Sequence, residues 1–109
     1  KYENKYLTFL NDLRVQVELI RKSIMNYSEI IPINQDVVSA AEEDLKLVQK
    51  RYSIGSATIL EVLDAQVSLI RSNSTLINTV HDARIQEMRL KALLGMLDIE
   101  YQTKEEEIK

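Results

Sequence analysis

Apolar residues recur in alternating steps of four and three through the first half of the chain. Only Asn34 is polar among the fourteen positions of this row, which we call the first seam. The first seam contains Tyr6, Leu10, Leu13, Val17, Ile20, Ile24, Tyr27, Ile31, Asn34, Val38, Ala41, Leu45, Val48 and Tyr52. A pattern sustained over this length is typical of a helix that packs in coiled-coil fashion.

The second half of the chain carries a similar row, the second seam, which has three polar interruptions. It is expected to contain Val62, Gln66, Leu69, Asn73, Leu76, Val80, Ala83, Glu87, Leu90, Leu94 and Leu97. The chain therefore predicts a second long helix that packs against the first.

A further apolar row lies beside each seam. The row beside the first seam holds Ile30, Ile33, Val37, Ala40 and Leu47, and the row beside the second holds Ile59, Leu63, Ile70 and Ile77. One seam suffices for a pair of helices, whereas two adjacent seams indicate a neighbour on both sides, as in a bundle or a closed ring. We therefore expect the chain to lie against more helices than it contains, because two helices cannot bury four rows.

Composition narrows the classes of protein. Two glycines and one proline in 109 residues argue against a sheet, which needs many turns. The absence of cysteine excludes a disulfide framework, and a net charge of −3 gives no basis for nucleic-acid binding. No apolar run approaches the roughly 20 residues of a membrane-spanning helix. We expect a soluble, acidic, all-α segment.

The breaks in the pattern set the expected domain organisation. Pro32 removes a backbone donor and crowds the preceding turn, so a kink or a short break is expected there, although the first seam keeps its phase. We expect a single long antiparallel helical hairpin of the coiled-coil type, since the connection is short. Its parts are an incoming helix over 1–53, kinked near Pro32, a tip turn over 54–57, an outgoing helix over 58–97 and a tail over 98–109.

The turn has its own sequence features. Gly55 can adopt the left-handed conformation that closes a helix, and Lys50 and Arg51 place positive charge in the last turn, where the helix dipole favours it. Thr58 followed by Glu61 fits a capping box at the start of the next helix. The first helix is therefore expected to end near Ser53.

No residue pattern indicates an enzyme, a metal site or a cofactor. His81 is the single histidine and has no carboxylate or second histidine three or four residues away, so we expect it at the surface or between helices. Glu61 and Asp64 admit two interpretations: helix capping with a favourable dipole interaction, or an acidic ring formed by symmetry at a pore mouth. Tyr52 is a seam residue beside the turn, where its hydroxyl could also reach a neighbouring helix or water.

Three strings in the second half resemble a known family. "RYSIG", "EVLDA" and "ALLGML" occur in this order and at suitable spacing for the C-terminal repeat of the TolC-like outer membrane efflux proteins. The upstream "YSEIIPINQDVVSAAEEDL" is similar to members in which a proline interrupts the incoming helix. The resemblance covers roughly residues 6–97.

The resemblance implies a particular architecture and location. Members are trimers in the outer membrane of Gram-negative bacteria, and each protomer has two repeats. Each repeat contributes strands to a membrane barrel and a long helical hairpin to a periplasmic α-barrel. The hairpin tips form the periplasmic entrance and dock on a periplasmic adaptor protein, which links the channel to an inner-membrane pump. The chain would then be one hairpin of an export duct for drugs, metal ions or secreted proteins.

The resemblance also implies roles for residues of the turn. Tyr52 corresponds to a tyrosine that helps hold the entrance shut, and Asp64 to an acidic residue at the constriction. The surface that meets the adaptor corresponds to Ile54, Gly55, Ser56, Thr58, Glu61 and Val62. Ala57 departs from the pattern of the best-known member, which has an arginine there that ties the gate closed. The closing network of this chain must therefore differ.

Two other functions remain open at this point. One is the helical hairpin of a periplasmic adaptor itself, although "RYSIGSATILEV" lacks the spaced arginine, leucine and serine that adaptor tips usually present. The other is a coiled-coil scaffold without a transport role, which would leave the match of three strings as coincidence.

Overall fold

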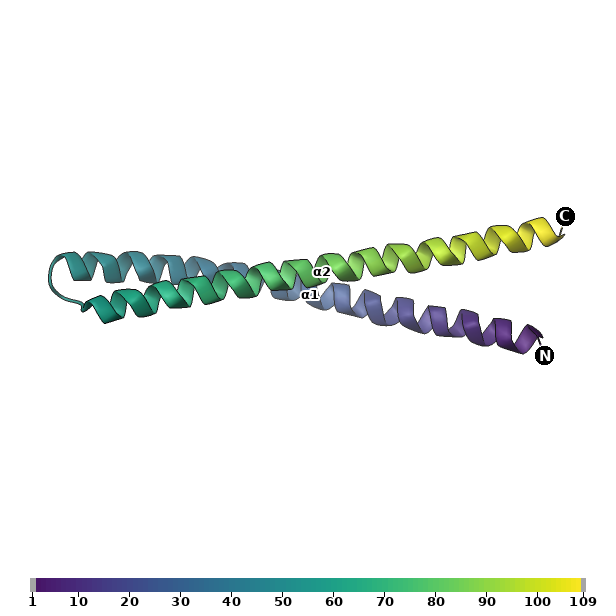
Figure 1. Cartoon of the computed structure of the whole chain (residues 1–109), viewed down its shortest axis with the longest axis horizontal. Coiled ribbons are helices and arrows are strands. Elements are labelled where there is room, and N and C mark those ends of the chain that lie inside the picture. Colours follow the sequence, from purple (N-terminus) through teal and green to yellow (C-terminus); the bar gives the residue numbers. More distant parts are fainter. Residues whose placement is uncertain (1, 109) are drawn as a thin grey trace. The chain divides into compact units, whose positions relative to one another are not determined.

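The chain forms two long helices joined by a short turn. The computed structural model describes the backbone of residues 2–108 and the side chains of residues 3–99, 102, 103 and 105–107. Helix α1 spans Tyr2–Ser53 and helix α2 spans Ile59–Ile108 (Figure 1). Residues 2–108 include no strand. The predicted fold class, an all-α helical hairpin, is confirmed.

The helix bounds agree with the sequence at the turn and differ from it elsewhere. α1 ends at Ser53, the expected residue. At Pro32 the sequence predicted a kink or a short break. The helix continues through Pro32 without a break, and the kink stays a prediction. α2 continues to Ile108, so a helix occupies most of the expected tail over 98–109. This stretch contains no glycine or proline and is rich in glutamate, a good helix former.

The hairpin divides into two compact units. One unit, which we call the tip unit, is Tyr27–His81 and contains the turn. The other, the distal unit, combines Lys1–Asn26 with Asp82–Lys109. In each unit a segment of α1 pairs with a segment of α2 that runs in the opposite direction. The buried apolar side chains are Val38, Val62 and Ala65 in the tip unit and Leu13, Val17 and Ala83 in the distal unit.

The first seam faces α2 as the sequence predicts. Every one of its fourteen residues is buried or half-buried except Tyr52, which is 48% exposed beside the turn. The polar member, Asn34, is half-buried and bonds across the hairpin to Thr79 at 3.1 Å. The regular spacing of this seam was therefore sufficient to identify the inner face of α1.

The second seam was wrong at three of its eleven positions. The positions that are buried or half-buried as expected are Val62, Leu69, Asn73, Leu76, Val80, Ala83, Leu90 and Leu97, whereas Gln66, Glu87 and Leu94 are exposed. Ala65, Gln86 and Leu93 occupy the inner face instead. At these three places the row therefore runs in steps of three and then four, the reverse of the assumed order. The physical reason is that this order keeps Gln66 and Glu87 in water, where polar groups need no buried partner.

The core between the helices is thin, and much apolar surface is uncovered. The rows beside the two seams are exposed throughout, with Ile33, Ile70 and Ile77 at 60%, 65% and 66%. Among the described residues no polar or charged side chain is buried, and no side chain of any kind is less than 2% exposed. Most of the stability of a helix in a protein comes from packing of its apolar face. These helices therefore present further faces on which other helices could pack.

Candidate functional site

The tip, residues 51–64, begins with the end of α1. Ser56 N–H donates to the carbonyl of Arg51 at 2.7 Å, and Gly55 N–H donates to the carbonyl of Tyr52 at 3.1 Å. These two bonds form a Schellman motif, in which the residue after the helix adopts a left-handed conformation. Gly55 takes that place with φ of +78°. The glycine therefore ends α1 as the sequence predicts, because its lack of a Cβ removes the steric penalty.

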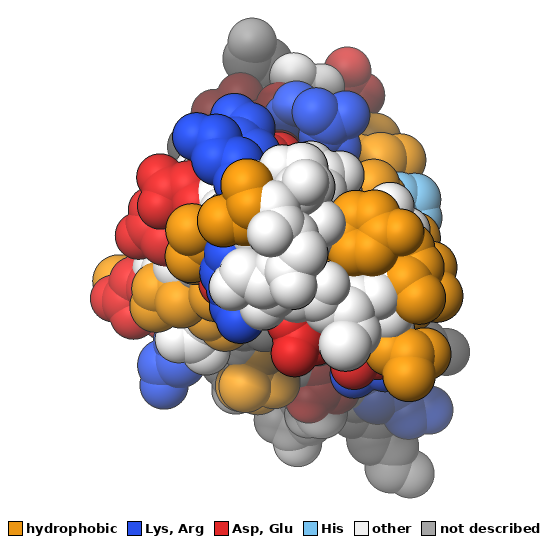
Figure 2. Space-filling model, turned by 90° about the vertical axis from the view of Figure 1, so that its left-hand side faces the viewer, with side chains coloured by type: hydrophobic (Ala, Val, Ile, Leu, Met, Phe, Trp, Pro, Cys, Tyr) orange, Lys and Arg blue, Asp and Glu red, His pale blue; other side chains and the backbone are white. Residues whose placement is uncertain are grey.

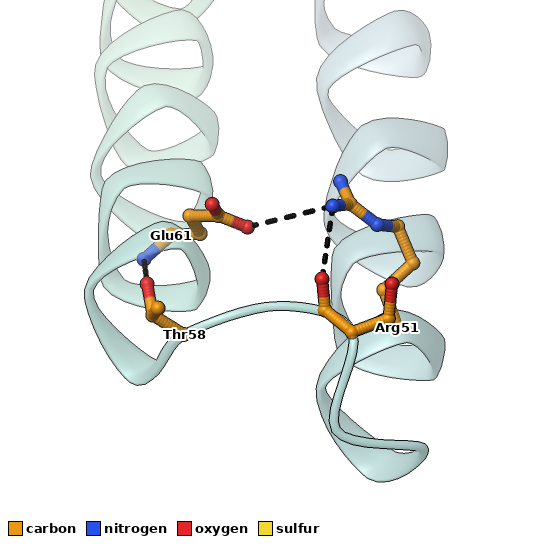
Figure 3. Close-up of polar contacts among 4 residues, drawn as sticks. Arg51, Thr58 and Glu61 are labelled. Carbon is orange, nitrogen blue, oxygen red and sulfur yellow. Dashed lines mark hydrogen bonds and ion pairs between the residues drawn. The ribbon is translucent and has the colours of Figure 1, made fainter.

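The start of α2 is capped by Thr58. The backbone N–H of Glu61 donates to Thr58 Oγ1 at 3.3 Å, and the N–H of Val62 donates to the Thr58 carbonyl at 3.3 Å. Half of the expected capping box is present. The carboxylate of Glu61, which would complete it by reaching back over Thr58, points across the turn toward Arg51 instead (Figure 3).

Arg51 connects the two helix ends. Its Nη2 donates to the carbonyl of Ser56 at 3.1 Å and lies 3.9 Å from Glu61 Oε2 (Figure 3). The side chains of Arg51 and Glu61 are 46% and 49% exposed, so water reaches both. We call these two contacts of the Arg51 side chain the clasp. They link the last turn of α1, the turn itself and the first turn of α2.

Most of the residues expected at the tip surface lie there. Ile54 is 79% exposed, and Gly55, Ser56, Thr58 and Glu61 are also exposed. Val62 is different, since it is only 6% exposed and packs in the core between the helices. The Val62 side chain therefore packs between the two helices next to the turn and is not part of the tip surface in this structure.

The end of the hairpin that carries the turn has a small polar centre between apolar side chains. Figure 2 shows backbone and small polar side chains in the middle of this end and hydrophobic side chains on either side. The exposed apolar residues of the tip include Tyr52, Ile59 and Leu60, at 48%, 51% and 68%. These apolar side chains are available for contact with a partner at this end of the hairpin.

The two acidic residues of the tip differ in their surroundings. Glu61 pairs with Arg51, which supports the interpretation that it has a local structural role. Asp64 is exposed one turn further along α2, and its carboxylate is accessible to solvent. An acidic ring at a pore mouth would need symmetry-related copies of Asp64, so this role stays a prediction.

Sequence reasoning missed the contribution of Arg51. We expected this residue only to favour the helix C-terminus through its charge, and the resemblance implied a closing arginine in another member at the position of Ala57. Ala57 is half-buried, and the arginine that acts on the turn is Arg51, six residues earlier. The opposite charges of Arg51 and Glu61 on the two sides of a short turn were the available signal.

No group of three or more His, Cys, Asp or Glu residues is placed to hold a metal ion in the searched residues, and His81 is exposed. The distal unit has an open groove of about 410 Å³ between its two helices, lined by Gln16, Leu19, Ile20, Arg89, Ala92 and Leu93. In the described residues, neither helix has a stretch long and apolar enough to cross a membrane.

Comparisons with known proteins identify a family. The family model for the outer membrane efflux protein matches residues 15–96. The chain is 34% identical over 89 residues to outer membrane protein TolC of Escherichia coli (strain K12), an alignment that covers 78% of this chain and 18% of that protein. TolC of Salmonella enteritidis gives the same identity and coverage. The chain thus spans less than a fifth of the length of these relatives. No solved structure gave a significant match.

Proposed function

The chain belongs to the outer membrane efflux protein family, and from this premise we propose that it is a helical hairpin in the periplasmic α-barrel of an export channel. The observation that carries the proposal is the second apolar row on each helix of the tip unit. The row on α1 includes Ile33 and Val37, which are 60% and 50% exposed, and the row on α2 includes Ile70 and Ile77, which are 65% and 66% exposed. The wall of a tube built from helices needs a neighbour on both sides of every helix.

The neighbours in this proposal are other hairpins of the same channel. Rows of exposed Ile, Leu and Val in a lone hairpin would leave apolar surface in water. The free-energy cost is about 25 cal/mol for each Å² of that surface. Packing against equivalent hairpins removes that surface from water. A homotrimer with two hairpins per protomer, as the resemblance implies, would supply such neighbours. The channel would reside in the outer membrane and this hairpin in the periplasm.

The tip would form the periplasmic entrance of the channel and dock a periplasmic adaptor protein. Ile54, Gly55, Ser56, Thr58 and Glu61 are the exposed residues that would meet the adaptor. Their exposure and the absence of bulky side chains between Ile54 and Thr58 support a close approach by a partner. The function needs no cofactor, since the hairpin contributes a wall and a contact surface.

Tyr52 and Asp64 would line the entrance itself. Both side chains are exposed, and they lie on opposite sides of the turn, at the end of α1 and in the second turn of α2. In this role Tyr52 helps to narrow the entrance and Asp64 contributes negative charge to it. Repetition of Asp64 by symmetry would attract cations to the pore mouth.

The family assignment also bears on the other functions that the sequence left open. A model of the outer membrane component matches most of the chain, which argues against the hairpin of an adaptor and against a scaffold without a transport role. The members of this family are channels, so the chain is not an enzyme.

The proposal is tested by photo-cross-linking in cells that produce the full-length protein. The photoreactive residue benzoylphenylalanine is placed at position 54 in the tip or, as a control, at position 39, where Ser39 is exposed on α1 away from the turn. We expect position 54 to give an adduct that mass spectrometry identifies as a periplasmic adaptor, and position 39 to give none. Equal adducts from both positions, or none from position 54, would refute the docking role.

A further inference from the structure

We propose that Arg51 is a positioning residue whose salt-sensitive clasp holds the tip turn in the conformation that docks a partner. This inference rests on the proposed docking function and adds a means of controlling it. The clasp consists of the bond from Arg51 Nη2 to the Ser56 carbonyl at 3.1 Å and the 3.9 Å ion pair with Glu61.

The place of Arg51 within the Schellman motif is the first argument. A motif of this kind is commonly accompanied by a hydrophobic contact between the residue after the glycine and a residue in the last helical turn. Here those two places are taken by Ser56 and Arg51, whose backbones already share a 2.7 Å hydrogen bond. The guanidinium of Arg51 also donates to the Ser56 carbonyl, so the backbone and the side chain of Arg51 both bond to Ser56. A polar bridge thus replaces the usual apolar contact.

The link to α2 is the second argument. Glu61 is fixed at its backbone, because its N–H donates to the Thr58 hydroxyl at 3.3 Å. Through the Glu61 carboxylate, the Arg51 side chain ties the end of α1 to the capped start of α2 (Figure 3). A planar guanidinium has several donors in a fixed fork and can serve a carbonyl and a carboxylate together, which a lysine ammonium does less well.

The clasp holds Ser56 and Glu61 and leaves two other proposed contact residues, Ile54 and Gly55, free. Between Ser53 and Thr58 the chain is held at Ser56, while Ile54 projects with 79% of its surface exposed and Gly55 has open space around its Cα. Fixing a loop in its bound conformation lowers the entropic cost of binding. Arg51 is therefore expected to act on docking through the turn.

Salt sensitivity follows from exposure. About half of each side chain in the ion pair is open to solvent, so dissolved ions screen the attraction. The order of the turn should consequently fall as the ionic strength rises. A purely structural role through packing would not show this dependence.

The test compares Arg51→Met with Lys50→Met in the full-length protein, after trimer formation has been checked. Both changes remove one positive charge from the last turn of α1 and keep an unbranched stem, but only Arg51 makes the clasp. Hydrogen–deuterium exchange of peptides that span the turn is measured in 0.05 M and 1 M KCl, conditions for which the Debye length falls from above ~10 Å to ~3 Å. We expect Arg51→Met to speed exchange about fivefold at low salt and to abolish its salt dependence. Lys50→Met should speed exchange much less, because it loses only the favourable interaction with the helix dipole.

Glu61→Gln separates the two parts of the clasp. It keeps the backbone bond to Thr58 and removes only the ion pair, so exchange should be about twofold faster and independent of salt. If Arg51→Met and Lys50→Met exchange alike, the clasp does not order the turn and the inference is overturned.

Photo-cross-linking from position 54 provides the second readout. We expect Arg51→Met to lower the yield of the adaptor adduct several-fold and Lys50→Met to leave it unchanged. Faster exchange with an unchanged yield would overturn the positioning role. If the wild type itself gives no adduct, the proposed docking function is wrong, while the exchange data still decide whether the clasp exists.

Discussion

The side-chain amide of Asn34 donates a 3.1 Å hydrogen bond to the hydroxyl of Thr79 across the hairpin. Thr79 in turn donates to the carbonyl of Thr75 at 2.8 Å, so its single hydroxyl proton and an acceptor site are both used. Asn34 is the one polar residue in the first seam. A lone polar residue at such a position is known to fix the register of paired helices at a cost in stability.

Replacement of both partners by apolar residues should therefore separate register from stability. In the variant Asn34→Leu with Thr79→Val, we expect the free energy of unfolding to stay unchanged or to rise by up to about 1 kcal/mol. Distances between spin labels at positions 46 and 68, both exposed in the tip unit, should become more broadly distributed. Gln35→Leu, at an exposed neighbour, is the control and should leave the distribution narrow. An equally narrow distribution in the double variant would show that this bond does not set the register.

Two valines of α2 allow a matched test of the core. Val62 is 6% exposed and Val67 is 52% exposed, and both are in the tip unit. Val62→Ala should lower the free energy of unfolding by roughly 1.5 kcal/mol, because it removes two buried carbons and leaves a cavity. Val67→Ala should change it by less than about 0.5 kcal/mol in the unassembled chain. Thermal unfolding followed by circular dichroism at a fixed chain concentration compares them, and equal losses would contradict the inner face assigned to α2.

The uncovered row on α2 should drive association. Ile70 and Ile77 are 65% and 66% exposed, and the variant Ile70→Ser with Ile77→Ser should weaken self-association of the chain. Gln66→Ser changes an exposed polar residue on the same helix and should have no effect. Sedimentation velocity over a range of concentrations measures the change. A wild-type chain that remains a monomer at all concentrations would count against the role assigned to this row.

The cap of α2 and the ion pair at the turn should contribute separately. The bond that caps the helix runs from the backbone of Glu61 to Thr58 Oγ1, so Glu61→Ala preserves it. We expect Thr58→Ala to cost about 1 kcal/mol of stability. Glu61→Ala should cost less, from about 0 to 1 kcal/mol, through the exposed pair with Arg51. Chemical denaturation of the two variants decides between this order and the reciprocal capping box, in which the two losses would be similar.

The sequence predicts the turn well because its determinants are local. A glycine able to adopt a positive φ and a threonine three residues before a glutamate define the end of α1 and the start of α2. The inner face of α1 is equally clear, since its apolar row is almost uninterrupted. Local sequence and backbone geometry point to the same structure at each of these places.

The inner face of α2 was harder to assign because apolar residues lie on more than one side of this helix. Steps of four then three and steps of three then four share Val62, Leu69 and Leu76, and they differ at positions such as 65 and 66. The structure selects Ala65 over Gln66. The clasp was not predicted from the sequence, because it depends on the direction of the Arg51 side chain. That direction is set by the fold of the turn and not by residue spacing.

Gly55 gives the most direct test of the central claim that this turn is a docking surface. A Cβ added at Gly55 would meet no atom within 4 Å, so only its φ of +78° opposes a larger residue. Asparagine tolerates the left-handed conformation, whereas valine would pay about 1–2 kcal/mol for it. Gly55→Asn therefore keeps the turn and adds a side chain to its surface, while Gly55→Val also strains the turn.

The decisive measurement is the yield of the adaptor adduct from position 54 in full-length protein that carries Gly55→Asn. The variant must first assemble as the wild type does and show the thermal midpoint of the wild type. We predict that the adduct and export are both lost although the fold is intact, because the added side chain prevents close approach of the partner. Wild-type cross-linking and export in this variant would contradict the account, and the turn would then serve only to end one helix and begin the next.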